Sequence, residues 1–262
     1  MKKGFVIMMI LILISAIGAL AMQIHHPIEI TIVYDNNPFD KNLQTDWGFS
    51  GFIKGLSKTL LFDTGKDSEI LLSNMKKLEI HPRSVEVVVL SHEHKDHTGG
   101  LEGLLKEKPG IEVWVPYFFD SSFKEKVEKN GCHLVEVNGF QKICDGAYTT
   151  GVIRGWIKEQ SLILDSLQGI ILMTGCTHPR IVNIIDKVKA LMNKDIHLAL
   201  GGFHLAGFPK KEIKEIIAHF REAGVKEVGP CHCSGDEARR LFAEEYGTDF
   251  IEIGVGKRIE LE

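Results

Sequence analysis

Short, almost wholly apolar segments alternate along the chain with segments whose apolar residues recur at helical spacing. The segments Ile28 to Tyr34 and Val85 to Leu90 are of the first kind, and their β-branched content predicts buried strands. Ser68 to Leu78 is of the second kind, because its apolar residues lie three, four or eight positions apart, as on one face of a helix. Strands and helices are interleaved in this way throughout. The pattern predicts an α/β fold in which two sheets carry helices on their outer faces.

The same criteria predict the remaining elements. Helices are expected at 98–106, 118–129, 179–192, 210–223 and 237–246. Further strands are expected at 49–53, 59–62, 111–115, 134–137, 147–153, 161–164, 170–173, 196–200, 225–228, 250–253 and 258–261. Several of these strands are continuous apolar runs, which is typical of sheets buried on both faces.

The first 21 residues differ in kind from the rest. Lys2 and Lys3 precede an apolar run over residues 5–21, which ends with Ala19 and Ala21 two positions apart. A basic start, an apolar middle and a small-residue end are typical of an export signal, here cut after Ala21. An uncleaved membrane anchor is the alternative, although a spanning helix prefers about 20 apolar residues. We therefore expect one domain over residues 22–262, exported to the periplasm or medium or anchored through residues 5–21.

Composition narrows the choice of partners. The formal net charge is −4 and Lys and Arg form no basic stripe, so a nucleic-acid partner is not expected and a small-molecule substrate is. Five cysteines make a poor disulfide framework for a chain of this length. One bridge within the following set is still conceivable after export: Cys132, Cys144, Cys231 and Cys233.

Four candidate metal ligands lie within six residues, directly after the predicted strand at 85–90. They are His92, His94, Asp96 and His97. Imidazole and carboxylate groups suit zinc and similar divalent ions. We expect His92 and His94 to continue the strand's period of two and to point to one side. Asp96 and His97 are expected in the following turn, aimed at a second position nearby. A solvated histidine-rich loop is the alternative, but chance seldom gathers such residues behind a buried strand.

The spacing His-x-His-x-Asp-His resembles the metal motif of the metallo-β-lactamase superfamily. Residues 60–65, LLFDTG, are also similar to the strand and aspartate that precede this motif in the superfamily. The resemblance extends over the mature chain and implies a four-layer αβ/βα sandwich with two divalent ions at one edge. It also implies that Asp63 supports the site by orienting a ligating imidazole. Without it, Asp63 would equally suit a plain turn before Gly65.

Three further histidines each follow a predicted strand: His178, His204 and His232. Strand ends that converge on one edge form the sites of layered α/β folds, and we expect these side chains near the motif. The segments TGCTHP, GGFHL and CHCSG around them are similar to a subgroup often named for a dihydropterin ribofuranosylaminobenzene phosphate synthase. We predict His178 and His232 as ligands and His204 for proton transfer or substrate contact. An exchange of roles between His204 and His232 stays open.

Cys176 stands where many superfamily members carry a metal-bridging aspartate. A thiolate is softer than a carboxylate and would favour zinc. Cys176 is therefore a tentative ligand; the alternative is a small buried residue, with His178 as the ligand in its place. One ion is expected on His92, His94 and His178, and the other on Asp96, His97 and His232.

These residues predict a hydrolase that uses two divalent ions, with zinc favoured, to attack an ester, lactone or phosphoester through metal-bound hydroxide. Asp96 and His204 are the expected catalytic residues. A pterin-type transferase and a di-iron redox protein are alternatives. The export signal argues against the first, because pterin precursors should be cytosolic. His94 argues against the second, because related di-iron proteins carry Glu there. A non-catalytic binding module is disfavoured by the full ligand set.

No substrate-binding residue can be assigned from the sequence, but two loops are candidates for specificity. They cover residues 35–47 and 116–122, and their aromatic side chains, together with Phe203, are candidate pocket walls. Each aromatic residue has plain core packing as its alternative. The candidates are Trp47, Tyr117, Phe118, Phe119 and Phe203.

Overall fold

The structure is a computed structural model that describes residues 27–262; the expected export signal at residues 1–21 lies outside this range. One sheet has seven strands. In spatial order they are β13 (Arg258–Leu261), β1 (Ile28–Asp35), β2 (Phe49–Lys54), β3 (Leu60–Phe62), β4 (Val87–Val89), β5 (Glu112–Pro116) and β6 (His133–Val137). The second sheet has six strands: β12 (Glu227–Cys231), β11 (Ile196–Gly202), β10 (Gly169–Thr174), β9 (Leu162–Ser166), β8 (Ala147–Thr149) and β7 (Gln141–Cys144).

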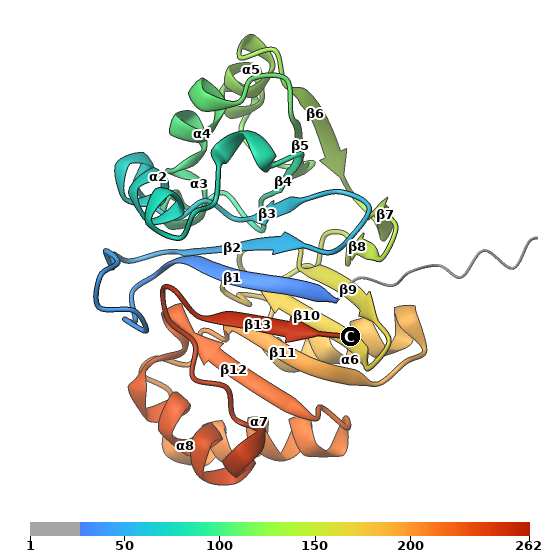
Figure 1. Cartoon of the computed structure of the whole chain (residues 1–262). Coiled ribbons are helices and arrows are strands. Elements are labelled where there is room, and N and C mark those ends of the chain that lie inside the picture. Colours follow the sequence, from blue (N-terminus) through green and yellow to red (C-terminus); the bar gives the residue numbers. More distant parts are fainter. Residues whose placement is uncertain (1–26) are drawn as a thin grey trace, which may run out of the picture.

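Helices cover the outer face of each sheet, and the two sheets pack face to face between them (Figure 1). The first sheet is covered by α2 (Ser68–Lys77), α4 (Leu101–Glu107) and α5 (Ser121–Lys129), with the one-turn α3 (Lys95–Thr98) at its edge. The second sheet is covered by α6 (Ile181–Met192), α7 (Lys210–Glu222) and α8 (Asp236–Tyr246). Short 3₁₀ turns η1 (Pro82–Ser84), η2 (His232–Ser234) and η3 (Gly247–Asp249) complete the chain. The four-layer sandwich expected from the sequence is confirmed.

Apolar side chains form three layers of core. The central layer lies between the sheets and includes Ile30, Phe62 and Leu200, all fully buried. The two outer layers lie between each sheet and its helices. Burial on both faces explains why the strands read as apolar runs rather than as alternating patterns.

The direction of strand pairing determines where a site can form. Strands β3, β4 and β5 pair in parallel, and so do β10, β11 and β12. Carboxyl ends of parallel neighbours meet at one edge of a sheet, so the loops that follow them lie together. The candidate ligands all follow such strands.

Some element boundaries differ from the prediction. The helix expected at 98–106 is divided into α3 and α4 by Gly99 and Gly100. A Cβ on Gly99 would lie 2.1 Å from the carbonyl oxygen of Lys66, so this close approach requires glycine. Strand β12 lies two to three residues later than expected, and β7 was not predicted. The strand expected at 250–253 is absent, and Phe250 makes only an isolated bridge with Val228.

Two further observations concern the chain as a whole. The five cysteines are all buried and free, so the conceivable disulfide does not form. Among residues 27–262, none of the helices combines the length and the apolar character that crossing a membrane requires.

Candidate metal centre

Two groups of metal-ligating side chains lie next to each other where the parallel strands end. The first group is His92, His94 and His178; the second is Asp96, His97, Cys176 and His232. Within each group, one donor atom from every residue lies within 4.8 Å of the others. This grouping matches the division between two ions expected from the sequence. His178 lies in the first group and Cys176 in the second, so the two side chains occupy different positions and neither replaces the other.

The first group joins the loop after β4 to the turn after β10. The rings of His92 and His94 lie 4.6 Å apart, centroid to centroid, and that of His178 lies 4.8 Å from His92 and 5.0 Å from His94. Strand β4 ends at Val89; His92 lies in a bend and His94 is the N-cap of α3, so neither extends the strand as predicted, although both face the first group. His92 is fully buried whereas His94 is exposed, which leaves one side of the group open.

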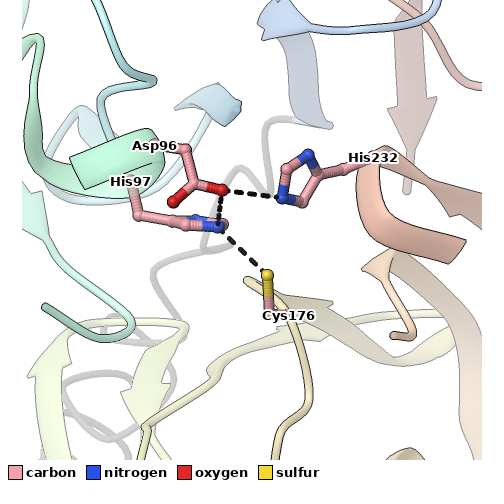
Figure 2. A group of neighbouring side chains, drawn as sticks. All are labelled: Asp96, His97, Cys176 and His232. Atoms are coloured by element: carbon pink, nitrogen blue, oxygen red, sulfur yellow. Dashed lines mark hydrogen bonds and ion pairs between the residues drawn. The ribbon is translucent and has the colours of Figure 1, made fainter. Parts of the chain in front are cut away.

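The second group joins α3 to β10 and β12, as Figure 2 shows. His97 Nε2 lies 3.2 Å from Cys176 Sγ and 3.6 Å from Asp96 Oδ2. His232 Nε2 lies 3.4 Å from the same Asp96 oxygen. Asp96 and His97 were expected in a turn, but both lie in the one-turn helix α3. The carbonyl of His94 closes this turn by accepting the N–H groups of His97 at 3.0 Å and Thr98 at 3.2 Å.

Asp63 holds the motif from behind, in the way the family resemblance implied. Its Oδ2 lies 2.7 Å from His97 Nδ1 and accepts the Ser91 hydroxyl at 2.7 Å, while Oδ1 accepts the Ser91 N–H at 2.7 Å. Asp63 and His97 are both fully buried. Because Asp63 accepts a hydrogen bond from Nδ1–H of His97, the lone pair of this imidazole lies on Nε2. Nε2 is the atom that faces the other side chains of the second group.

Glu159 does for His178 what Asp63 does for His97, and sequence reasoning missed it. Its Oε2 lies 2.9 Å from His178 Nδ1, and its Oε1 accepts the N–H of Thr177. Glu159 is fully buried in the loop before β9, and no motif in the sequence marks this position. Asn36, also missed, contacts His232 Nδ1 through Oδ1 at 2.9 Å. These partners fix which ring nitrogen is left for an ion.

Electrostatics favour the ligating forms of three of the seven candidate ligands. Burial, followed by the charge of His97, holds the pKa of His92 well below its usual range. Burial and the charge of His204 lower the pKa of His178 to about 4. Both imidazoles are thus neutral at pH 7, the form that binds a metal. Burial alone would raise the pKa of Asp96, but its contacts with His232 and His97 hold that pKa well below the usual range, so Asp96 is ionised.

His204 lies beside the first group rather than in either. Its ring centroid is 4.6 Å from that of His178. It forms a third cluster with Cys176 and Cys233, whose sulfurs lie 3.4 Å apart. Contact with the Cys233 thiol raises the pKa of His204. Cys233 belongs to the CHCSG segment, but the sequence suggested for it only a disulfide. The position of His204 suits proton transfer, and His232 takes the place predicted for a distant ligand.

The backbone is strained where these side chains emerge. Asp63, Thr177, His204 and His232 have φ values of 55°, 65°, 52° and 48°, in the left-handed region that non-glycine residues seldom adopt. Such strain persists only where the surrounding structure imposes it, and it clusters at functional sites. Each of these residues lies within three positions after a strand, at the edge where the candidate ligands gather.

The aromatic residues predicted as candidate pocket walls lie in different environments. The ring of Trp47 lies 4.9 Å from that of His232, so Trp47 borders the second group. Phe119 is buried in the outer core of the first sheet and is no wall. Tyr117 and Phe118 pack under the ammonium of Lys158. Phe203 is buried against α7 and α8 and also lines a cavity beside His178 and His204.

The residues present fit divalent cations. His232 Nε2 is buried, makes no hydrogen bond and faces Asp96 Oδ2 3.4 Å away, so an ion between the two would satisfy both groups. Three imidazoles in one group, and two imidazoles, a carboxylate and a thiol in the other, are donor sets typical of zinc and similar ions.

Comparisons with known proteins agree with this geometry. The family described as "Metallo-beta-lactamase superfamily" matches residues 48–186. A 7,8-dihydropterin-6-methyl-4-(beta-D-ribofuranosyl)-aminobenzene-5'-phosphate synthase from Methanocaldococcus jannaschii is 30% identical, over 88% of this chain and 95% of the relative. The crystal structure of Tm1679, described as a metal-dependent hydrolase of the β-lactamase superfamily, aligns with a TM-score of 0.75 and 25% identity, covering 89% of this chain and 99% of that one.

A more distant structure extends the agreement in fold. The metallo-β-lactamase fold protein YhfI from Bacillus subtilis aligns with a TM-score of 0.66 and 13% identity, over 89% of this chain and 99% of that one. The layered sheets, the histidine motif and the matched residues all lead to one assignment. The chain belongs to the metallo-β-lactamase superfamily.

Proposed function

We propose that the protein is a hydrolase that uses two divalent ions, zinc in the first place, to cleave an ester, lactone or phosphoester. The observation that carries this proposal is the pair of adjacent donor groups, each held by a buried carboxylate behind one histidine. Ions in these positions would lower the pKa of a coordinated water and polarise the oxygen of the bond to be cleaved.

The chain's own residues supply the rest of the mechanism. Asp63 and Glu159 keep Nε2 of His97 and His178 directed at the ions. Asp96, ionised and in contact with His97 and His232, offers a carboxylate between the ligands of the second group. His204 is the proton donor for the leaving group, because contact with Cys233 raises its pKa and its ring lies beside His178.

Elemental analysis and a substrate panel test this proposal together. Purified mature protein should contain about two divalent ions per chain. It should hydrolyse members of a panel of aryl esters, lactones and phosphodiesters, and a chelator should abolish that activity. Replacing His94 with Ala removes a ligand of the first group, whereas His133→Ala changes an exposed histidine outside both groups and serves as the control.

Loss of activity and of about one ion in His94→Ala, with neither loss in His133→Ala, is the expected result. Protein that holds the ions but turns over no member of the panel would support a non-catalytic module, and unchanged turnover in His94→Ala would contradict the proposal. Iron in place of zinc, with redox activity, would support the di-iron alternative.

A transferase is the second candidate, favoured by the 30% identity to the relative named as a synthase. The same donor groups could activate a substrate hydroxyl or position a phosphate-bearing substrate instead of water. Turnover that requires a second organic substrate and does not incorporate solvent oxygen into the product would favour this candidate. We also propose export, which the basic and apolar residues before Ala21 support; N-terminal sequencing of protein expressed with the full chain tests it.

A further inference from the structure

We propose that a cavity beside His178 and His204 binds the non-reacting part of the substrate, an aromatic or similarly flat apolar group that carries an anionic substituent. Arg154 is the residue assigned to that anion. This inference rests on the proposed function, because it assumes that the reacting bond lies at the two donor groups.

The cavity opens directly from the candidate metal centre. It has a volume of about 440 Å³ and lies between residues 154–156, residues 177–183 and residues 203–208. His178, a candidate ligand, and His204, the assigned proton donor, both line it. Sites for small molecules have volumes of about 300–1,000 Å³. A substrate with its reacting bond at the ions could therefore extend into this space.

Its walls are largely apolar and aromatic. Trp156 is 79% exposed, and its ring centroid lies 5.8 Å from that of His178. Phe208 forms another part of the lining. An exposed indole at the mouth of a cavity offers a flat face for stacking at a small cost in conformational entropy. These surfaces suit a flat apolar group better than an extended polar chain.

The charges on the lining have one sign. Arg154 and Arg180 line the cavity, and no carboxylate does. Arg180 is already engaged, because it pairs with Glu212 and its guanidinium lies 5.8 Å from the ring centroid of Phe208. Arg154 makes no salt bridge within the described residues 27–262. A guanidinium without a carboxylate partner suits a carboxylate, sulfonate or phosphate, which it can bind through two parallel hydrogen bonds.

Binding of three small probes to the metal-loaded protein tests this assignment without relying on turnover. Benzenesulfonate carries both the ring and the anion, benzyl alcohol carries the ring alone, and methanesulfonate carries the anion alone. Calorimetric titration should show benzenesulfonate binding about tenfold or more tightly than either of the others, since a hydrogen-bonded charge contributes about that factor.

Variants separate the two parts of the cavity. Arg154→Gln should weaken benzenesulfonate about tenfold and leave benzyl alcohol unchanged, and Arg154→Lys should restore part of the loss. Trp156→Ala should weaken both aromatic probes. The matched control is Lys158→Gln, which removes a nearby cation that lies over Tyr117 and Phe118 and not on the cavity lining.

Two results would overturn the inference. One is equal affinity for benzenesulfonate and methanesulfonate; the other is the same loss of affinity in Arg154→Gln and Lys158→Gln. Neither result touches the proposed function, which stands on metal content and chelator-sensitive turnover. Conversely, purified protein that binds the probes as expected but takes up no divalent ion would contradict the proposed function; the cavity would then remain a site for flat anions, but not a substrate subsite of that reaction.

Discussion

Glu159→Gln separates metal binding from folding more cleanly than the loss of a ligand does. Burial raises the pKa of Glu159 to about 8, so the metal-free protein holds this carboxyl protonated at pH 7. Glutamine has nearly the same shape as the protonated acid. We therefore expect the metal-free variant to unfold at nearly the temperature of the metal-free parent protein.

The substitution should instead weaken the binding of the ion that His178 helps to hold. An ionised Glu159 accepts a hydrogen bond from the N–H group at His178 Nδ1, 2.9 Å away, so the lone pair of the neutral ring stays on Nε2. With its oxygen still on the N–H of Thr177, a glutamine turns its amide N–H toward Nδ1 and forces the proton onto Nε2, the nitrogen needed by the ion. Partners of this kind contribute about 10–100-fold in metal affinity, or about 1.4–2.7 kcal/mol.

Competition for zinc with a chromophoric chelator measures this effect, because the two ions can be counted separately as they leave. The Glu159→Gln variant should bind one ion about 10–100-fold more weakly than the parent protein does, with its affinity for the other ion unchanged. Asp63→Asn should reverse the pattern, since Asp63 holds His97 of the second group. Glu136→Gln, at an exposed position, is the control. Parent affinity for both ions in Glu159→Gln would refute the reasoning.

Three further predictions follow from the same geometry. Gly175→Ala should destabilise the fold by about 1–3 kcal/mol, because its Cβ would lie 2.2 Å from Ser91 Oγ; Gly139→Ala, with nothing within 4 Å, should leave the chemical denaturation midpoint unchanged. Burial lowers the pKa of His178 from 6.5 to about 4, so only the unfolded chain takes up this proton between those values. In metal-free Glu159→Gln protein, which lacks the opposing titration of Glu159, the free energy of unfolding should therefore fall by about 2 kcal/mol from pH 6.5 to pH 4, as followed by urea titration. Chelation at pH 7 should lower the calorimetric Tm, and added zinc should restore it, because the ions bind only the folded state; a Tm insensitive to chelator would count against a native metal site.

Local patterns in the sequence were sufficient where neighbours in the chain determine the structure. The apolar spacing of Ser68 to Leu78 predicts α2 to within one residue, and the motif places His92 and His97 behind β4. Three separate histidines behind three strands also indicated convergence, since parallel strands share an edge. The structure brings His178 and His232 to the motif; their role as ligands stays a prediction.

What the sequence could not predict depends on contacts between distant segments. Glu159 precedes β9 in a stretch without periodicity, and only strand pairing within the second sheet, where β9 lies beside β10, brings it to His178. The pairing of Cys176 with Cys233 has the same origin. The break between α3 and α4 arises because Gly99 lies against the backbone of Lys66, a contact that helix propensity does not contain. The cavity near Trp156 likewise combines three loops, none of which has a signature of its own.

The second donor group draws Asp96 and His97 from one sheet's connections and Cys176 and His232 from the other's. An ion bound there would be a cross-link between the halves of the molecule, which also touch through the central apolar core and through hydrogen bonds such as that between Asn36 and His232. The centre can assemble only after the halves have docked, so ion release reports their separation. During refolding, zinc uptake should accordingly be a late event that follows the collapse of the central core.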